Sequence, residues 1–137
     1  MNMKLSHGRK RRILLADDST SIQKIVKRVA TRYGHEVIEA TVGATVLEIA
    51  ASVTPDVIVL DIEFPDADGR DILSALKADP RTSQIPVVVW SGRKGHESDS
   101  RISLELGAED YVEKNDAQLL LRKLDRVLLK LDAADAR

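Results

Sequence analysis

The feature that most constrains the fold is an alternation, repeated five times, of a short apolar run with a stretch of helical periodicity. Two of the runs contain only apolar residues, and these are Val57-Ile58-Val59-Leu60 and Val87-Val88-Val89-Trp90. Strands without polar alternation are typical of a parallel sheet that is covered on both faces. Right-handed crossovers through the intervening helices then predict a doubly wound α/β domain with a five-stranded parallel sheet.

Three shorter runs complete the five predicted strands, and glycine and proline mark the ends of helices between them. The shorter runs are Ile13 to Ala16, Val37-Ile38 and Tyr111-Val112. The third helix is expected to stop before Pro80, because the residue that precedes proline disfavours the helical conformation. Gly107 is expected to end the fourth helix. The connections that result have ordinary lengths, and the chain forms a single domain.

The charge is unevenly distributed along the 137 residues. Five of the 21 basic residues lie in the first twelve positions, which contain no acid, so the remainder carries sixteen basic against 22 acidic residues, or −6. An acidic body is not expected to bind nucleic acid, and we recognise no DNA-binding domain. We divide the chain into a basic leader over residues 1–11, expected to be flexible, one domain over 12–132 and a frayed tail over 133–137.

Composition excludes several classes of protein. Apolar residues make up 43% and charged residues 31%, which is typical of a soluble globular domain. No apolar run approaches the ~20 residues that cross a bilayer, and no apolar segment of a secretory signal follows the basic start. The sequence has no cysteine, which excludes disulfides, thiol catalysis and cysteine-ligated metals and fits a cytoplasmic protein.

Polar side chains end four of the predicted strands, at the edge where a parallel sheet of this kind binds its ligands. Asp17 and Asp18 end the first strand, and Asp61 ends the third. Ser91 ends the fourth strand, and Lys114 lies just beyond the fifth. Three carboxylates, a hydroxyl and an ammonium group are therefore expected to converge at one edge of the sheet.

This set of groups indicates a particular chemistry. Three carboxylates repel each other unless a cation joins them, and oxygen ligands with room for water and phosphate favour Mg²⁺. A carboxylate can also act as a nucleophile and form an acyl phosphate. We therefore expect Mg²⁺ as the cofactor and Asp61 as the nucleophile. Lys114 would balance the charge on the phosphoryl oxygens, and Ser91 would hydrogen-bond one of them.

Each residue also has an ordinary structural interpretation. Asp18 can cap the helix that follows it, Ser91 can belong to a turn with Gly92, and Lys114 can be a solvated surface lysine. Taken singly, those interpretations are favoured for all but Asp61. Taken together they are not, since all the residues lie at strand ends on the same edge of the sheet.

The motifs resemble those of the response-regulator receiver family of two-component signalling, over about Arg12 to Leu131. They occur in the family's order as ILLADDS, PDVIVLDIEFPDADGRDIL, IPVVVWSG and LGAEDYVEK. The resemblance implies the flavodoxin-like fold with strand order 2-1-3-4-5. Within this family the chain resembles the stand-alone regulators of chemotaxis.

The resemblance also implies a role for each site residue. Asp61 would be the phospho-acceptor. The ligands of Mg²⁺ would be Asp18, Asp61 and the backbone carbonyl of Glu63, with Asp17 holding the ion through water. Ser91 would be the switch hydroxyl. Tyr111 would be the rotating aromatic residue, and Lys114 would contact the phosphoryl group.

The partners that the resemblance implies are proteins. The phosphoryl donor would be a sensor histidine kinase or a histidine phosphotransfer protein, and a downstream effector would bind the surface of the fourth helix, fifth strand and fifth helix. Phosphorylation-dependent dimers are also common in the family. The protein would then be a signalling switch and not an enzyme, catalysing only its own phosphotransfer and dephosphorylation.

A few positions depart from the family's common pattern. Asn115 follows Lys114, where the family usually has proline, and Glu63 and Arg93 add charges near the pocket. Trp90 precedes the switch hydroxyl and is expected to be a core residue.

Two alternative functions stay open at this stage. One is a pseudo-receiver, an interaction module that is not phosphorylated, which the intact acidic trio disfavours. The other is an aspartyl-phosphate phosphatase of the haloacid dehalogenase kind. Such enzymes place a second aspartate two residues after the nucleophile, where this chain has Glu63.

Overall fold

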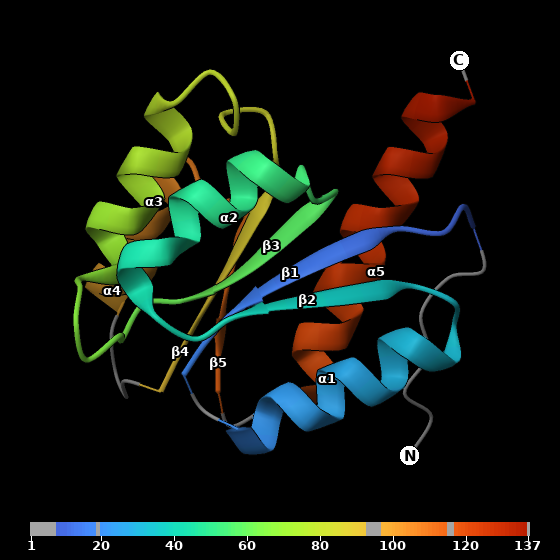
Figure 1. Ribbon diagram of the computed structural model, residues 1–137, viewed down its shortest axis with the longest axis horizontal. Helices are drawn as coiled ribbons and strands as arrows, with labels where there is room; N and C mark the ends of the chain where they lie inside the picture. Colours follow the sequence, from blue (N-terminus) through green and yellow to red (C-terminus); the bar gives the residue numbers. More distant parts are fainter. Residues whose placement is uncertain (1–7, 19, 93–96, 115–116, 137) are drawn as a thin grey trace.

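Five parallel strands form one sheet in the order β2-β1-β3-β4-β5 (Figure 1). The computed structural model describes residues 8–18, 20–92, 97–114 and 117–136. The strands are β1 (Arg12–Ala16), β2 (Glu36–Ala40), β3 (Val57–Asp61), β4 (Val87–Ser91) and β5 (Asp110–Glu113). The helices are α1 (Thr20–Arg32), α2 (Val46–Val53) with the 3₁₀ turn η1 (Gly43–Thr45) before it, α3 (Gly69–Ala78), α4 (Glu97–Glu105) and α5 (Ala117–Asp135). The predicted fold class and strand order are confirmed.

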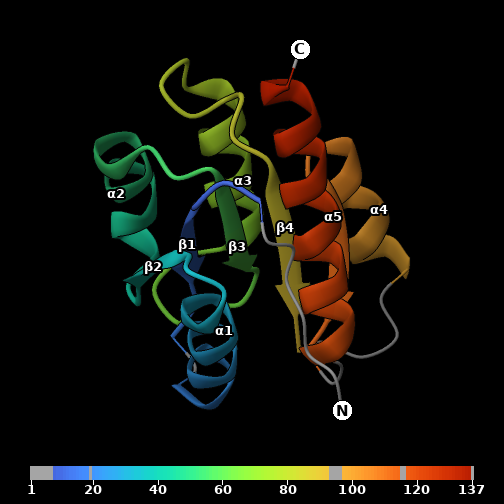
Figure 2. The same ribbon diagram turned by 90° about the vertical axis from the view of Figure 1, so that its right-hand side faces the viewer.

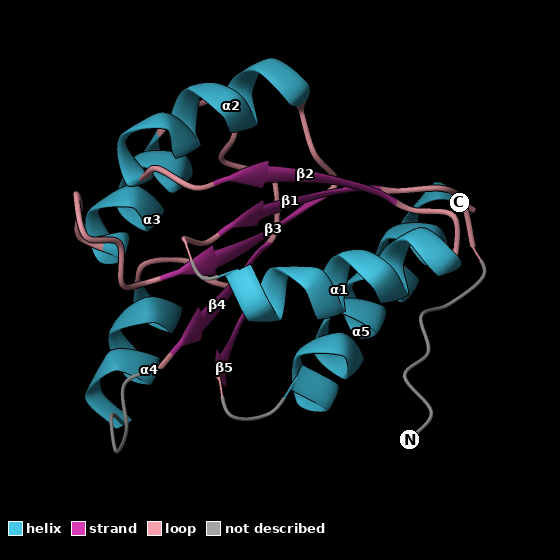
Figure 3. Ribbon diagram, turned by 60° about the horizontal axis from the view of Figure 1, so that its bottom comes forward, coloured by secondary structure: helices cyan, strands magenta, loops and turns pink. Residues whose placement is uncertain are grey.

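Helices cover both faces of the sheet, which explains why its central strands lack polar alternation. α1 and α5 lie on one face, and α2, α3 and α4 lie on the other (Figures 2 and 3). Successive strand residues point to opposite faces, so Ile13 and Leu15 pack beneath α1 and α5 while Leu14 packs beneath α2 and α3. Every residue of β3 and β4 is buried. Within the described ranges, no helix is long and apolar enough to cross a membrane.

The loop between β3 and α3 is held against the sheet by close backbone contacts. Gly69 lies so near the loop that a Cβ atom on it would be 2.3 Å from the Cα of Ile62, so only glycine fits. The carboxylate of Asp66 accepts hydrogen bonds of 2.9 Å from the first two backbone N–H groups of η1. Both contacts fix the loop that follows Asp61 and therefore the position of that residue.

Ion pairs join the two ends of the described chain at the amino-terminal edge of the sheet, next to the start of β1. Arg11 is only 5% exposed, and its Nη2 atom lies 2.7 Å from carboxylate oxygens of both Asp132 and Asp135. Its Nη1 atom lies 3.5 Å from Asp56. The expected flexible leader over residues 1–11 and frayed tail over 133–137 stay predictions, and residues 1–7 and 137 lie outside the described residues. α5 continues to Asp135 because its acidic end pairs with Arg11.

Replacing Arg11 tests the contribution of this contact to stability. The variant Arg11→Met keeps the aliphatic stem but leaves three carboxylates without their shared cation, so we expect it to lower Tm by on the order of 5 °C. Arg9→Met is the matched control, because Arg9 is exposed and, among the described residues, forms an ion pair with Asp135 alone. Its Tm should change by about 1 °C or less. Thermal unfolding followed by circular dichroism measures both, and equal effects of the two variants would contradict the prediction.

Candidate functional site

Three carboxylates meet at the carboxyl-terminal edge of the sheet. One oxygen from each of Asp17, Asp18 and Asp61 lies within 4.8 Å of the other two. Asp17 and Asp61 are 0% and 1% exposed, whereas Asp18 is exposed. The topology brings them together, because β1 and β3 are neighbours and Ala16 pairs with Leu60 directly before the acidic residues. The structure thus assembles the acidic trio that the sequence placed at the strand ends.

The backbone of Asp17 is fixed from two sides. Its N–H donates to the carbonyl oxygen of Ala40 at 3.0 Å, which extends the pairing of β1 with β2 by one residue. Its own carbonyl oxygen accepts a hydrogen bond from the side-chain amide of Gln23, a buried residue of α1. The Asp17 carboxylate is therefore presented to the pocket from a rigid backbone.

Lys114 inserts its ammonium group between two of the carboxylates. Its Nζ atom lies 2.8 Å from Oδ2 of Asp61 and 3.2–3.3 Å from the two carboxylate oxygens of Asp17. Its backbone N–H donates to the carbonyl oxygen of Ser91 at 2.8 Å, so the pairing of β4 with β5 continues up to the pocket. The sequence placed Lys114 near the acidic trio, and the structure puts its charge in direct contact with it.

Burial controls the protonation of these groups. It raises the pKa of Asp61 to about 6, helped by the charge of Asp17 and opposed by hydrogen bonds from Lys114 and the backbone N–H of Glu63. Burial also acts to lower the pKa of Lys114, but its hydrogen bond to Asp61 and the charges of Asp17 and Asp61 outweigh that effect and raise it. Lys114 is therefore a cation at neutral pH, yet its one charge leaves Asp61 harder to ionise than a free aspartate.

The donor set fits a hard divalent cation. All three clustered side chains offer carboxylate oxygens, which are the ligands that Mg²⁺ and Mn²⁺ accept together with water. The raised pKa of Asp61 shows that further positive charge would stabilise its ionised form. The exposure of Asp18 leaves one side of the cluster open to solvent.

The other predicted site residues lie around this cluster. Ser91 is 0% exposed and ends β4, directly after the residue that pairs with Asp61. The backbone N–H of Glu63 donates to Oδ1 of Asp61 at 2.9 Å. Tyr111 is half-buried on β5 and packs against the apolar cluster that α2 and α3 cover. The switch roles of Ser91 and Tyr111 and the carbonyl ligand from Glu63 stay predictions. Two departures from the family pattern, at positions 93 and 115, lie outside the described residues.

Trp90 is a site residue that sequence reasoning missed. It is fully buried, as expected of a core residue, but its indole Nε1–H also donates to Oδ2 of Asp17 at 2.8 Å. Nζ of Lys114 lies 5.8 Å from the centroid of its ring. No motif in the sequence indicates this contact, because it depends on the register of three strands, in which β3 pairs Leu60 with Ala16 and Asp61 with Trp90.

Comparison with known proteins agrees with this architecture. Residues 13–125 match the family model described as the response regulator receiver domain. Because the match spans most of the chain, the protein belongs to the response regulator receiver family.

Its relatives include both short and long proteins. Chemotaxis protein CheV1 of Helicobacter pylori is 33% identical over 121 residues, which make up 85% of this chain and 37% of that protein. Protein PilH of Pseudomonas aeruginosa is 33% identical over 118 residues, 85% of this chain and 97% of that protein. The chain therefore spans less than two fifths of CheV1 and nearly all of PilH. The solved structure of response regulator Rcp1 in its Mn²⁺-bound form is similar with a TM-score of 0.70 and 28% identity, over 85% of this chain and 91% of that one.

The raised pKa of Asp61 predicts a pH-dependent stability in the absence of metal. An acid whose pKa is higher in the folded protein than in the unfolded chain favours folding while it is protonated, and that contribution is lost as the pH rises from about 4 to above 6. We therefore expect Asp61→Asn to raise Tm at pH 7.5 by on the order of 5 °C, with no difference from wild type below about pH 4.

Thermal unfolding in a metal chelator, repeated across this pH range, measures the effect. Added Mg²⁺ should raise Tm for the wild type and much less for Asp61→Asn. If the Tm difference between wild type and Asp61→Asn is the same at pH 4 and at pH 7.5, the raised pKa of Asp61 is contradicted.

Proposed function

We propose that the protein is a phospho-acceptor response regulator that receives a phosphoryl group on Asp61 from a sensor histidine kinase or a histidine phosphotransfer protein. The observation that carries the proposal is the placement of Asp61, clustered with Asp17 and Asp18 and 2.8 Å from Nζ of Lys114. Membership of the receiver family supports the same function. The protein would act in the cytoplasm as a switch and would catalyse only its own phosphorylation and dephosphorylation.

The proposed reaction replaces one bond at phosphorus with another. A carboxylate oxygen of Asp61 bonds to phosphorus as the bond to the donor's histidine nitrogen breaks, and that nitrogen keeps the electron pair. In the proposed reaction Lys114 would hold a phosphoryl oxygen and exchange part of its 2.8 Å contact with Asp61 for that oxygen. Bound Mg²⁺ would neutralise charge on the phosphoryl oxygens, and its proposed ligands are Asp18, Asp61 and the carbonyl of Glu63, with Asp17 acting through water. The similarity to Mn²⁺-bound Rcp1 supports a divalent cation at this site.

The proposed output begins at the end of β4. In this scheme the hydroxyl of Ser91 turns toward the new phosphoryl group, and Tyr111 on the adjacent strand β5 rotates in response. The backbone hydrogen bond from Lys114 to the carbonyl of Ser91 joins the two strands at this point. The surface of α4, β5 and α5 would then bind an effector protein, or a second copy of the phosphorylated chain.

A small phosphodonor tests the proposal directly. Incubation with acetyl phosphate and Mg²⁺ is expected to add one hydroxylamine-sensitive phosphoryl group, seen by intact mass, and Asp61→Asn should abolish it. Lys114→Met should slow the reaction about tenfold or more, because it removes a charge aimed at the transition state. Lys130→Met is the matched control, since Lys130 is an exposed lysine that pairs with Glu109 away from the pocket.

The outcomes separate the alternative functions. Mg²⁺ binding without any adduct would favour a pseudo-receiver, and an adduct that survives Asp61→Asn would overturn the assignment of the acceptor. Continuous release of phosphate from unrelated phosphomonoesters would favour a phosphatase.

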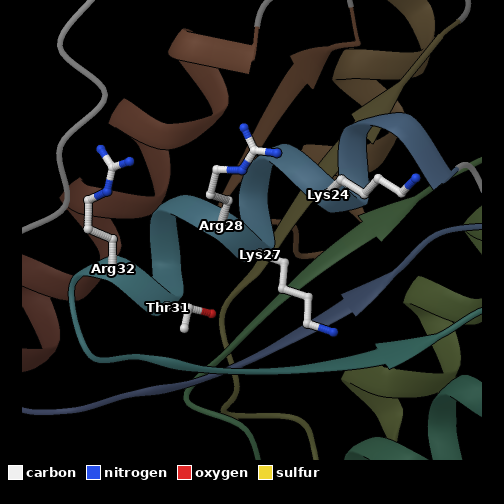
Figure 4. A pocket seen from close by; sticks show the side chains of 5 residues that line it. All are labelled: Lys24, Lys27, Arg28, Thr31 and Arg32. Atoms are coloured by element: carbon white, nitrogen blue, oxygen red, sulfur yellow. The ribbon is translucent and has the colours of Figure 1, made fainter.

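A cationic face on α1 supports docking of a protein donor on this helix. The helix begins two residues after Asp18 and carries four basic residues and no acidic one. Figure 4 shows these side chains projecting from successive turns of the helix. Together with Thr31 they line a groove of about 420 Å³, and the basic residues are Lys24, Lys27, Arg28 and Arg32. Because the rest of the domain is acidic, this face favours a donor with an acidic surface beside its phosphohistidine.

Charge reversal on this face is expected to separate two kinds of phosphorylation. Lys24→Glu with Arg28→Glu should slow transfer from a phosphorylated donor protein about tenfold or more at low salt, because like charges then meet during the encounter. Transfer from acetyl phosphate should not change. The matched control is Arg122→Glu with Arg126→Glu, an equally spaced exposed pair on α5. The docking proposal fails if both pairs slow the protein donor equally, or if the α1 pair also slows acetyl phosphate.

A further inference from the structure

The hydrogen bond between Trp90 and Asp17 connects the core of the domain to its acidic pocket. The indole N–H is 2.8 Å from Oδ2 of Asp17, and both residues are 0% exposed. The ring belongs to the apolar cluster that α1 and α5 cover, which also contains Val112 and Leu121. A carboxylate with no exposed surface depends on such donors, because an unpaired one carries a large desolvation cost.

From this contact we infer that Trp90 is a positioning residue for metal binding. It holds the Asp17 carboxylate through Oδ2 and thereby sets the direction in which that carboxylate meets Mg²⁺ or its water. The inference rests on the proposed function in one respect, which is that the acidic trio binds a divalent cation. It assigns a role to an aromatic residue that is neither a ligand nor a contact of the phosphoryl group.

Lys114 and Trp90 both donate to the carboxylate of Asp17, but metal binding affects them differently. Lys114 contacts both Asp17 and Asp61, and its positive charge is repelled when a divalent cation enters the same cluster. The indole N–H is neutral and lies in the packed core, so it does not compete with the cation for the carboxylate. Trp90 therefore keeps Asp17 oriented after Lys114 has turned toward the phosphoryl group. Hydrogen-bond partners of metal ligands commonly contribute 10–100-fold to metal affinity.

A double-mutant cycle on Mg²⁺ affinity tests this role. Calorimetric titration at pH 8 would compare wild type, Trp90→Phe, Asp17→Asn and the double variant. We expect Trp90→Phe to weaken Mg²⁺ binding about tenfold in the wild-type background and less than about twofold in the Asp17→Asn background. Leu121→Ala is the packing control, because Leu121 lies in the same cluster but on α5. It should lower Tm without changing the Mg²⁺ affinity.

The wild-type protein supplies a second measurement that needs no change at position 90. Trp90 is the only tryptophan, so the indole N–H gives a single ¹⁵N-correlated NMR signal. That signal should move with Asp17→Asn, and it should move with Mg²⁺ at the concentrations that bind in calorimetry. An indole signal that ignores Asp17→Asn overturns the inference, and so does an equal loss of Mg²⁺ affinity from Trp90→Phe in both backgrounds.

The result is independent of phosphorylation. A protein that is phosphorylated on Asp61 but shows no coupling between Trp90 and Asp17 overturns the role of Trp90 alone. A coupled cycle in a protein that takes no phosphoryl group overturns the proposed function and supports the role of Trp90.

Discussion

The repulsion among three carboxylates at one edge of a buried sheet is the constraint on which the rest of this site depends. Asp17 and Asp61 are almost completely buried, and Asp18 joins them from the solvent side. The side chains of Asp17 and Asp61 have almost no contact with solvent, so water screens their charges only weakly. Lys114 supplies one positive charge, yet the pKa of Asp61 still rises to about 6. The folded chain is therefore complementary to an additional cation, and the unfavourable energy of the acidic cluster becomes binding energy for that cation.

The same constraint explains why the fold surrounds the pocket with fixed backbone. A flexible loop would let the carboxylates move apart and relieve their repulsion without binding anything. Asp17 is instead tied to β2 through Ala40, and the loop after Asp61 is tied down by the close packing of Gly69 on Ile62. The apolar layers on both faces supply the stability that offsets this local cost, in keeping with the general observation that functional sites store unfavourable interactions.

The sequence predicts what depends on periodicity and strand ends, and it misses what depends on side-chain reach. The buried runs of β3 and β4 predict a sheet covered on both faces, and the positions of Asp17 and Asp61 predict that they meet. The extension of α5 to Asp135 was not predicted, because Arg11 is 121 residues away from Asp132 in the sequence. The contact of Trp90 with Asp17 was missed for the same reason, since it spans 73 residues and crosses an intervening strand. A hydrophobic pattern reports that an indole is buried but gives no information about where its one N–H group points.

Two adjacent residues of β4, Trp90 and Ser91, make contacts with different parts of the site. Trp90 points toward the layer of α1 and α5 and reaches Asp17, while Ser91 ends the strand beside Asp61 and accepts a backbone hydrogen bond from Lys114 through its carbonyl. A displacement of β4 toward a phosphoryl group would therefore move the donor of Asp17 together with the proposed switch hydroxyl. Metal binding and switching would then not be independent, because each changes the free energy of the other through one strand. Under the proposed function, a cation bound by Asp17 would therefore be coupled through β4 to the contact of Ser91 with the phosphoryl group.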